Sequence, residues 1–267
     1  MTILLRLLAL ALGLALLTGP AAAAPDPAPA PSPEAAPDIA PLPVGTDADY
    51  QLGGARPVPA RVGIVVRDRR AEPAGRYDVC YVNAFQTQPD EHRSWKKRMH
   101  LVLRSKGEPV VDEAWGEWLL DLRTGAKRAA LARIVGRWVD RCAADGYEAV
   151  EYDNLDSFTR SGGLLSRRQA LAYARLVVAE AHEAGLAVGQ KNLAGLDGSR
   201  IGFDFAVTEE CSRYRECGAY VAAYGRRVVA VEYRRQDFRR GCRQWGDRLP
   251  MVLRDLDVSP KGVRRFC

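Results

Sequence analysis

The stretch GYEAVEYDNLDSF, residues 146–158, decides the expected fold, because its apolar run ends in a cluster of acids. The run predicts a buried strand over 147–154, and Glu151, Asp153 and Asp156 follow one another within six residues. Side chains alternate along a strand, so Glu151 and Asp153 share one face with Ala149, while Tyr152 lies on the other. The acids therefore point toward one side of the predicted sheet, at the end of the strand.

Other segments of the chain repeat this plan of an apolar run that ends in polar residues. Buried strands are predicted over 62–66, 78–84, 187–192, 204–210, 227–233 and 249–255, with weaker candidates at 50–54 and 118–123. The polar ends are Asn83, Lys191 with Asn192, Glu209 with Glu210, Glu232, and Arg254 with Asp255. Alternation allows only one acid of the Glu209 and Glu210 pair to share a face with Val207.

Amphipathic helices are predicted between these strands, over 126–144 and 167–184. Ser166 and Gln169 form a capping box at the start of the second, and Gly146 and Gly185 follow the two helices as stops. Strand, helix, strand indicates a parallel sheet, either an open doubly wound sheet or a (β/α)8 barrel. Polar residues at so many strand ends favour the barrel, whose active site lies at that face. We therefore expect an α/β fold, a single-domain (β/α)8 TIM barrel.

The N-terminal region has a different character from the rest of the 267-residue chain. Residues 1–24 have the order of a secretory signal: Arg6, an apolar run over 7–17, then small residues. An uncleaved membrane anchor is the alternative, although spanning a bilayer takes about 20 apolar residues. Residues 25–46 are a Pro- and Ala-rich linker, and 47–267 form the catalytic domain. We expect a secreted, extracellular protein, either free or tethered at the cell surface, with no stable membrane insertion after cleavage.

Six cysteines lie in the predicted domain, and an even number in an exported chain indicates disulfides. Metal binding is the alternative, but there is no C-x-x-C pair, and the three histidines do not have metal-ligand spacing. Cys211 and Cys217 are close enough to close a short loop, whereas the other pairings stay open. The candidates are Cys80, Cys142, Cys211, Cys217, Cys242 and Cys267.

The formal net charge of +6 raises the question of a nucleic-acid partner. The basic residues are spread along the chain, as in KKR at 96–98 and RRQDFRR at 234–240, and no nucleic-acid-binding motif frames them. Solvated faces explain them better, so we expect no nucleic-acid partner and a monomeric protein. The glycine-rich nucleotide motifs are also missing, and no cofactor is expected.

Several carboxylates at one barrel mouth suit hydrolysis of a glycosidic bond, which uses one acid and one carboxylate. A structural ring of ion pairs with Lys191 and Arg254 is one alternative, and a Mg²⁺ or Ca²⁺ site is another. The EF-hand pattern is missing, and no bound metal is expected. G-x-S-x-G and H-E-x-x-H, which mark other hydrolases, are also missing from the sequence.

Four segments together resemble the endo-α-1,4-polygalactosaminidases, glycoside hydrolase family 114. They are AVEYDNLDSF at 149–158, VGQKN at 188–192, FDFAVTEECSRYRECGAY at 203–220 and VVAVEY at 228–233. The resemblance extends roughly from Asp49 to Asp257. It implies a (β/α)8 barrel that cleaves internal α-1,4 linkages in galactosamine-containing polysaccharide.

The resemblance also implies roles for individual residues. The acid that ends the E-x-D-N strand is Asp153 and the glutamate before the cysteine is Glu209, and these two would be the catalytic carboxylates. Members commonly have Pro in place of Tyr152 and N-E-Q-C in place of residues 208–211, differences that keep both carboxylates but bear on substrate preference. The substrate-binding set expected around the pair is Glu151, Asn154, Asp156, Lys191, Asn192, Tyr233, Glu232 and Asn83.

The implied partner is a galactosamine-rich polysaccharide, which is cationic where it is deacetylated. An acidic mouth would attract such a polymer even though the whole protein is basic. Five aromatic side chains are candidates for stacking against sugar rings: Trp115, Tyr152, Phe158, Tyr214 and Tyr233. A barrel that binds polysaccharide without cleaving it is the alternative function.

Overall fold

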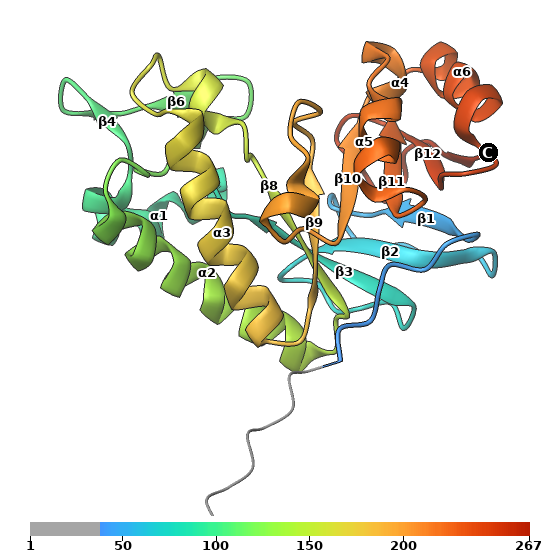
Figure 1. The fold of residues 1–267 in the computed structure, drawn as a ribbon, viewed down its shortest axis with the longest axis horizontal. Coiled ribbons are helices and arrows are strands. Elements are labelled where there is room, and N and C mark those ends of the chain that lie inside the picture. The colour runs from blue at the N-terminus through green and yellow to red at the C-terminus, as the bar shows by residue number, and fades with distance from the viewer. Residues whose placement is uncertain (1–37) are drawn as a thin grey trace, which may run out of the picture. The chain divides into compact units, whose positions relative to one another are not determined.

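The computed structural model describes residues 38–267, which form one twisted sheet with helices packed against it (Figure 1). Eight of its strands run parallel, in the order in which they occur along the chain. They are β1 (Asp47–Tyr50), β2 (Val62–Asp68), β3 (Tyr77–Asn83), β8 (Ala149–Asp153), β9 (Ala187–Lys191), β10 (Phe205–Glu209), β11 (Val228–Glu232) and β12 (Met251–Arg254).

The sheet curls into a nearly closed barrel. The last parallel strand, β12, lies beside β1, and β13 (Arg264–Phe266) pairs antiparallel with β12. At this seam Arg264 binds Asp49 of β1 at 2.8 Å, and so links β13 to the first strand. The expected TIM-like barrel is confirmed to this extent, and its strand order excludes the open doubly wound alternative.

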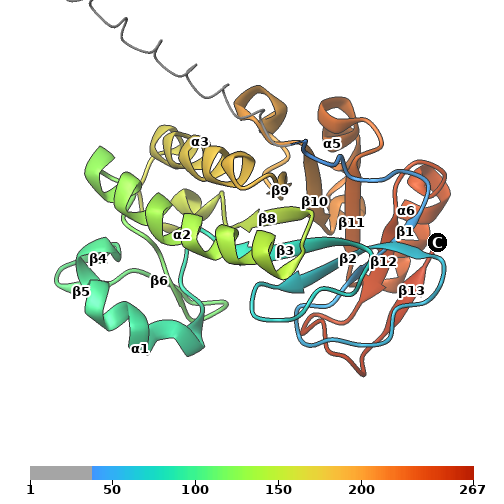
Figure 2. The same ribbon diagram turned by 90° about the horizontal axis from the view of Figure 1, so that it is seen from below.

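The ring of helices around the barrel is less complete than the (β/α)8 expectation. The connections from β1 to β2 and from β2 to β3, residues 51–61 and 69–76, contain no helix, and only η4 (Gly198–Ile201) joins β9 to β10. The larger helices are α2 (Gly125–Asp145), α3 (Arg167–Glu183), α5 (Cys217–Tyr224) and α6 (Arg235–Trp245). Figure 2 shows α2 and α3 side by side on the outer surface of the sheet.

The two predicted helices are confirmed with their caps. The Ser166 hydroxyl accepts from the Gln169 backbone N–H and the Gln169 side chain accepts from the Ser166 backbone, which is the expected capping box at the start of α3. Gly146 ends α2 in the left-handed conformation, with φ of 95°. The buried apolar side chains of α2 and α3 belong to one cluster, which also contains outward-facing residues of the strands.

Alternation along the strands separates two cores, as the sequence predicts. Inside the barrel lie residues such as Ala149, Phe205, Val207 and Val231. Between barrel and helices lie residues such as Val150, Tyr152, Ala206 and Ala230. Glu151 and Asp153 therefore share the inner face with Ala149, and Glu209 shares it with Val207.

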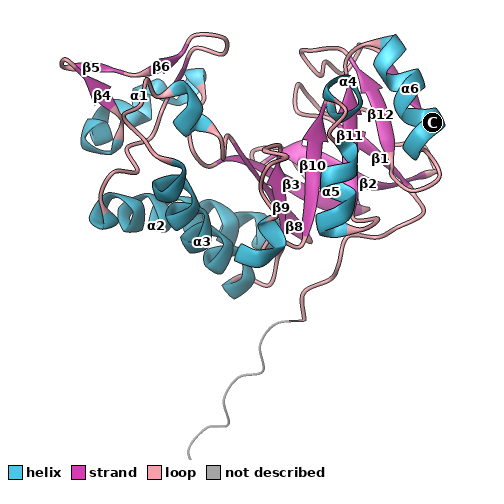
Figure 3. Cartoon of the chain, turned by 45° about the horizontal axis from the view of Figure 1, so that its top comes forward, coloured by secondary structure: helices cyan, strands magenta, loops and turns pink. Residues whose placement is uncertain are grey.

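A long excursion separates β3 from α2. It contains η1 (Pro89–Glu91), α1 (His92–Trp95), η2 (Lys96–Leu101) and two small hairpins, β4 (Arg104–Ser105) with β5 (Glu108–Pro109) and β6 (Val111–Asp112) with β7 (Glu117–Trp118). Figure 3 shows these short strands apart from the barrel sheet. The weak strand candidate 118–123 was wrong as a barrel strand, because Leu119 and Leu120 form isolated bridges within this excursion. The other, 50–54, is displaced: β1 ends at Tyr50.

The first described residues pack under the barrel, at the amino ends of its strands. Leu42 is buried in the inner core, Ile39 packs against that core, and the hydroxyl of Tyr77 donates to the carbonyl of Ala40 at 2.7 Å. Part of the predicted linker, from Ile39 on, is therefore packed against the domain. The predicted signal 1–24 and the rest of the linker lie outside the described residues. Among residues 38–267, no helix has the length and apolar character needed to cross a membrane.

The six cysteines form three disulfides. Cys211–Cys217 closes the short loop that the sequence predicts, and the structure adds Cys80–Cys142 and Cys242–Cys267. Cys80–Cys142 joins β3 to α2, and Cys242–Cys267 joins α6 to the C-terminal residue. Because all six sulfurs are paired, no cysteine can supply the thiolate through which a cysteine binds a metal.

Candidate active site

A cavity of about 530 Å³ opens at the carboxyl ends of the barrel strands. Residues on its lining come from the ends of β2, β3, β8, β9 and β10, from the β6–β7 hairpin and from the loop after β12. Seven of the predicted site residues line it: Asp153, Asn154, Asp156, Lys191, Asn192, Glu209 and Tyr233.

Lys191 lies at the centre of the site, between the two predicted catalytic carboxylates. Its ammonium Nζ is 3.5 Å from Asp153 Oδ2 and 3.4 Å from Glu209 Oε2. The lysine side chain is 1% exposed, so water screens these ion pairs poorly. Burial acts to lower the pKa of Lys191, but the carboxylates around it outweigh burial and raise that pKa well above its usual value. Lys191 is therefore a permanent cation between the two acids.

Two tyrosines hold the two candidate catalytic carboxylates from the barrel wall. The hydroxyl of Tyr81 donates to Asp153 Oδ2 at 2.8 Å, and the hydroxyl of Tyr233 donates to Glu209 Oε1. Burial and the adjacent carboxylates raise the pKa of both phenols well above the usual range, so both remain donors. Each carboxylate thus receives one phenolic hydrogen bond and faces the Lys191 ammonium.

Glu151 lies beneath this group and does not line the cavity. It is fully buried, its Oε1 is 3.2 Å from Lys191 Nζ, and it accepts a hydrogen bond from Tyr50 at 2.8 Å. Tyr50 in turn accepts from Lys191 at 2.9 Å. Burial raises the pKa of Glu151 to about 7, against the opposing effect of Lys191. Of the expected residues around the pair, Glu151 is thus one that the structure places beneath the cavity and against Lys191, outside the lining.

The residues that follow two of these strands turn sharply in the left-handed region. Asn154 has φ of 64° and Asn192 has φ of 52°, a conformation that asparagine tolerates better than most residues. The turn returns the Asn192 side chain to Glu209, where its Oδ1 accepts from the Glu209 backbone at 2.8 Å and its Nδ2 donates to Oε2 at 3.4 Å. The asparagines thus fix the strand ends that hold the carboxylates.

Glu117, which sequence reasoning missed, brings a further carboxyl group to the cavity from β7. Its Oε2 accepts from Asn154 Nδ2 at 3.2 Å. Burial raises the pKa of Glu117 to about 7. The segment DEAWGEW, 112–118, carries a signal that could have found it, because acids and tryptophans alternate there in a connection on the mouth side of the barrel. Arg160 lies alongside and binds both Asp112 and Asp156.

Two further members of the predicted substrate-binding set, Asn83 and Glu232, do not line the cavity. Asn83 lies under the cavity lining, where its Oδ1 accepts from Asn154 Nδ2 at 3.1 Å. Glu232 follows Val231, which faces the barrel interior, and so points outward. Its Oε1 accepts from the Ser212 backbone at 2.7 Å, and burial raises its pKa to about 7. Both residues support loops instead of reaching the cavity.

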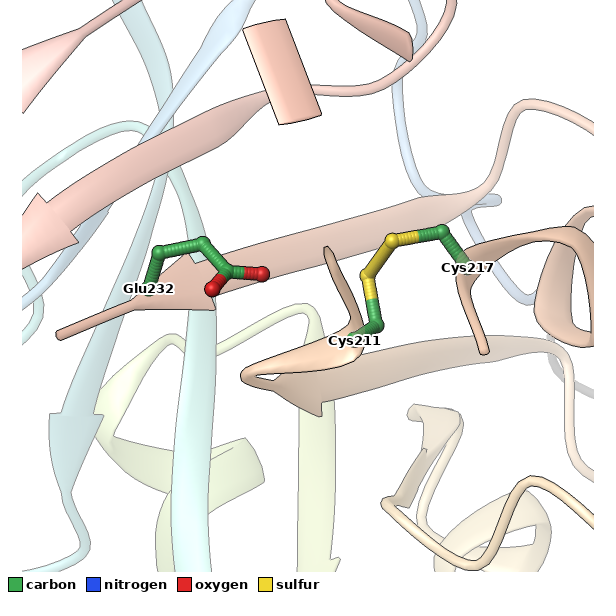
Figure 4. A group of neighbouring side chains, drawn as sticks. All are labelled: Cys211, Cys217 and Glu232. Carbon is green, nitrogen blue, oxygen red and sulfur yellow. A yellow bond between two sulfur atoms is a disulfide. The ribbon is translucent and has the colours of Figure 1, made fainter. Parts of the chain in front are cut away.

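Glu232 also lies beside the Cys211–Cys217 disulfide, as Figure 4 shows. One ligand-type atom from each of the three residues lies within 4.8 Å of the others. A disulfide supplies no thiolate, so this group does not have the donors of a metal site. Its effect is to fix the turn that follows Glu209.

Two of the five aromatic candidates line the cavity, Tyr233 and Trp115. Trp115 is 56% exposed at the rim, which leaves its ring free to stack against a sugar. Tyr152 is instead a core residue whose hydroxyl donates to the Val177 carbonyl, and Phe158 packs in the same outer core. Tyr214 is exposed but is not part of the lining.

The cavity is acidic although the chain is basic. Seven acidic and three basic side chains line it, an excess of four formal negative charges. The acids are Asp68, Asp112, Glu117, Asp153, Asp156, Glu209 and Asp257, and the bases are Arg70, Arg160 and Lys191. Of the two basic residues expected in a structural ring, Lys191 is present, whereas Arg254 is turned toward Asp49 at the seam.

The spacing of the central acids suits acid and base chemistry on one bond. Asp153 Oδ2 and Glu209 Oε2 are at most about 7 Å apart, since both lie against the same ammonium, and carboxylates roughly 5 to 9.5 Å apart serve glycoside hydrolysis. A barrel with a carboxylate pair at the carboxyl ends of its strands is the architecture of a glycoside hydrolase.

Comparisons with known proteins agree with that class. The model of glycoside hydrolase family GH114 matches residues 28–267, so the chain belongs to this family of glycoside hydrolases and the resemblance seen in the sequence is confirmed. Comparison with curated proteins found no match.

Solved structures show the same fold at low sequence identity. Ega3 of Aspergillus fumigatus, solved in complex with galactosamine, has a TM-score of 0.68 and 19% identity, over 85% of this chain and 97% of that one. The glycoside hydrolase domain of PelA from Pseudomonas aeruginosa has a TM-score of 0.56 and 17% identity, over 81% of this chain and 97% of that one.

Proposed function

We propose that this protein is an exported glycoside hydrolase that cleaves internal α-1,4 linkages of galactosamine-containing polysaccharide, with Asp153 and Glu209 as its catalytic carboxylates. The observation that carries the proposal is the pair itself. Both acids lie in the acidic cavity, from different strands, on either side of the Lys191 ammonium. One carboxyl group protonates the glycosidic oxygen, and the other stabilises or attacks the anomeric carbon.

The substrate class is supported by charge and by the family. Deacetylated galactosamine carries an ammonium group, and an acidic cavity in a low-dielectric wall concentrates cations at its mouth. Ega3, which has the same fold, was solved with galactosamine bound. The excess of acids over bases in the lining therefore suits a cationic sugar better than a neutral one.

The surrounding residues would hold the pair in place during the reaction. Tyr81 and Tyr233 each donate to one carboxylate, and Asn192 braces Glu209. Rigid hydrogen-bond donors of this kind keep reacting groups oriented without reorganisation. Trp115 at the rim offers a face on which a further sugar unit stacks.

Export is supported by the cysteine chemistry. All six cysteines are paired in disulfides, a state typical of proteins that fold in an oxidising compartment. The order of residues in 1–24 has the features of a secretory signal.

The test is to incubate the purified protein with partly deacetylated galactosamine polysaccharide and to follow the released products by size. Internal cleavage yields a mixture of oligosaccharides early in the reaction, whereas cleavage from an end yields small sugars only. Asp153→Asn and Glu209→Gln should each lower the rate at least a hundredfold, the loss expected for groups that transfer protons or attack.

Glu210→Gln is the matched control, since Glu210 adjoins Glu209 but binds Arg213 outside the cavity lining. It should leave the rate within about threefold of the wild type, as expected for an exposed ion pair. Equal rates in the Asp153, Glu209 and wild-type proteins would overturn the site assignment. Binding of the polymer without cleavage by the wild type would instead indicate a barrel that only binds polysaccharide.

A further inference from the structure

Glu117 differs from the other acids that line the cavity. Apart from exposed Asp257, each of those acids has a basic side chain within 4 Å: Asp68 with Arg70, Asp112 and Asp156 with Arg160, Asp153 and Glu209 with Lys191. Within residues 38–267, Glu117 forms no ion pair, although only 9% of its surface is exposed. A buried carboxylate without a cation is unfavourable, so this group attracts a positive charge.

The hydrogen bonds of Glu117 leave one of its oxygens for a ligand. Oε2 accepts from Asn154 Nδ2 at 3.2 Å, and also from the Gln86 amide at 2.9 Å when that amide is oriented to satisfy both of its neighbours. Oε1 accepts no hydrogen bond from the described residues, and the residue lines the cavity. Arg160, whose charge acts on Glu117, is itself paired with Asp112 and Asp156.

The position of Glu117 relates it to the reacting groups. Its hydrogen-bond donor Asn154 directly follows Asp153 in the sequence, and the Asn154 side chain is fixed between Glu117, Asn83 and Arg160. A sugar that contacts the free oxygen of Glu117 therefore lies next to the Asp153 carboxylate. The substituent that contacts Glu117 therefore belongs to a sugar unit at or beside the bond to be cleaved.

We infer that Glu117 binds the ammonium group of a deacetylated amino sugar and so makes the enzyme select deacetylated over N-acetylated units in its substrate. This inference rests on the proposed function and names the residue that distinguishes an amino group from an acetamido group. An ammonium supplies the missing cation and donates to the free oxygen. An acetamido group supplies no charge and fills more space, and the carboxylate would remain unpaired beside it.

Binding of an ammonium group should be coupled to the release of a proton from Glu117. Burial, together with Asp153 and Asp112, raises the pKa of Glu117 to about 7, while the nearby Asn83 amide and the charge of Arg160 act in the opposite direction. Below pH 7 the empty site therefore holds a proton on Glu117. Binding of an ammonium favours the ionised form, and that proton passes to solvent. Affinity for the cationic sugar should fall as the pH is lowered from 7 to 5, where the amine stays protonated.

The test compares wild type, Glu117→Gln and Glu113→Gln. Glu113 is an exposed acid on the same β6–β7 hairpin, outside the cavity lining, and is the matched control. Each protein is given galactosamine oligosaccharides that are either deacetylated or N-acetylated, and kcat/KM is measured for both. The expected result is a fall of at least tenfold for the deacetylated substrate in Glu117→Gln, the loss typical of a hydrogen bond to a charged group, with little change for the N-acetylated one.

Calorimetry adds a readout that does not depend on turnover. Binding of deacetylated galactosamine oligosaccharide to Glu209→Gln at pH 6.5, in buffers of different ionisation enthalpy, should release a fraction of a proton, and the double variant with Glu117→Gln should release none. Glu117→Asp, which keeps the charge, should recover part of the preference.

The outcomes separate this inference from the proposed function. Wild-type protein that neither binds nor cleaves any galactosamine oligosaccharide would overturn the proposed function. Wild-type cleavage with an unchanged preference in Glu117→Gln, or with equal losses on both substrates, would overturn the role of Glu117 alone. Equal proton release with and without Glu117 would do the same.

Discussion

The ammonium of Lys191 lies 3.2 Å from the Glu151 carboxylate, and both side chains are buried in the barrel. The same ammonium contacts the two carboxylates that face the cavity. Glu151 is thus connected to the candidate catalytic pair through Lys191, although it is shut off from the cavity. The pair of carboxylates and the support beneath it behave as one charged unit, which the first two predictions address.

Lys191→Met should abolish most of the activity and destabilise the fold. The substitution removes the cation that Glu151, Asp153 and Glu209 share. Removal of one partner from a buried ion pair lowers the free energy of unfolding by about 3 to 5 kcal/mol. The carboxylates repel one another only when ionised, so the destabilisation should be larger at pH 8 than at pH 4. Urea unfolding at both pH values measures it, and a loss that is independent of pH would contradict the arrangement.

Glu151→Gln should change how stability depends on pH. The pKa of Glu151 is raised by burial from 4.5 to about 7, so the folded protein holds a proton that the unfolded chain releases. Wild-type stability therefore falls as the pH rises from about 4.5 to 7, by up to roughly 3 kcal/mol from this group. The variant removes this component, and its stability relative to wild type should rise across that range.

The control for Glu151→Gln is Glu108→Gln, which replaces an exposed glutamate on β5. Its stability relative to wild type should stay constant over the same pH range in urea titrations. If Glu151→Gln behaves in the same way as this control, the glutamate is not buried beside Lys191 as described.

Glu232→Gln should remain active. Glu232 points away from the cavity and accepts a backbone hydrogen bond from Ser212, which a glutamine oxygen preserves. We expect kcat/KM within about threefold of the wild type, in line with substitutions away from reacting groups. Because burial raises the pKa of Glu232 from 4.5 to about 7, the stability of the variant relative to wild type should rise between about pH 4.5 and 7 and stay constant above that range. A fall in kcat/KM of a hundredfold would show that Glu232 does reach substrate.

The three disulfides should contribute unequally to stability. They close loops of 62, 25 and 6 residues, for Cys80–Cys142, Cys242–Cys267 and Cys211–Cys217. Loop-closure entropy then gives contributions of about 4, 3.5 and 2 kcal/mol in that order. Unfolding of the three double Cys→Ala variants under oxidising conditions tests the order. The Cys211–Cys217 variant should lose activity beyond its loss of stability, because Cys211 lies two residues after Glu209.

Most strands of the barrel can be predicted from the local pattern of apolar and polar residues. Seven strands were placed because each is a short apolar run bounded by turn residues, and alternation put Glu209 on the face of Val207, which lies inside the barrel. The same rule separates Glu232 from the cavity, since Val229 and Val231 occupy the inner face of β11. A polar residue at the end of a strand lies at the mouth only when alternation also places it on the inner face.

What the sequence did not predict depends on contacts between distant segments. Glu117 reaches the cavity from two-residue strands in an irregular excursion, where no periodicity exists to detect. Tyr50 lies 101 residues from its partner Glu151, and only closure of the barrel brings them together. The burial that keeps Glu151 from substrate likewise depends on the ring of strands as a whole.

The segment from Ile39 to Leu42 enters beneath the barrel, at the face opposite the cavity. The chain therefore enters the domain at one end of the barrel, while the cavity opens at the other end. A long polymer can lie across the cavity mouth without meeting residues 39–42. The polarity of the parallel strands thus keeps the entering chain and the incoming substrate on opposite ends of the domain.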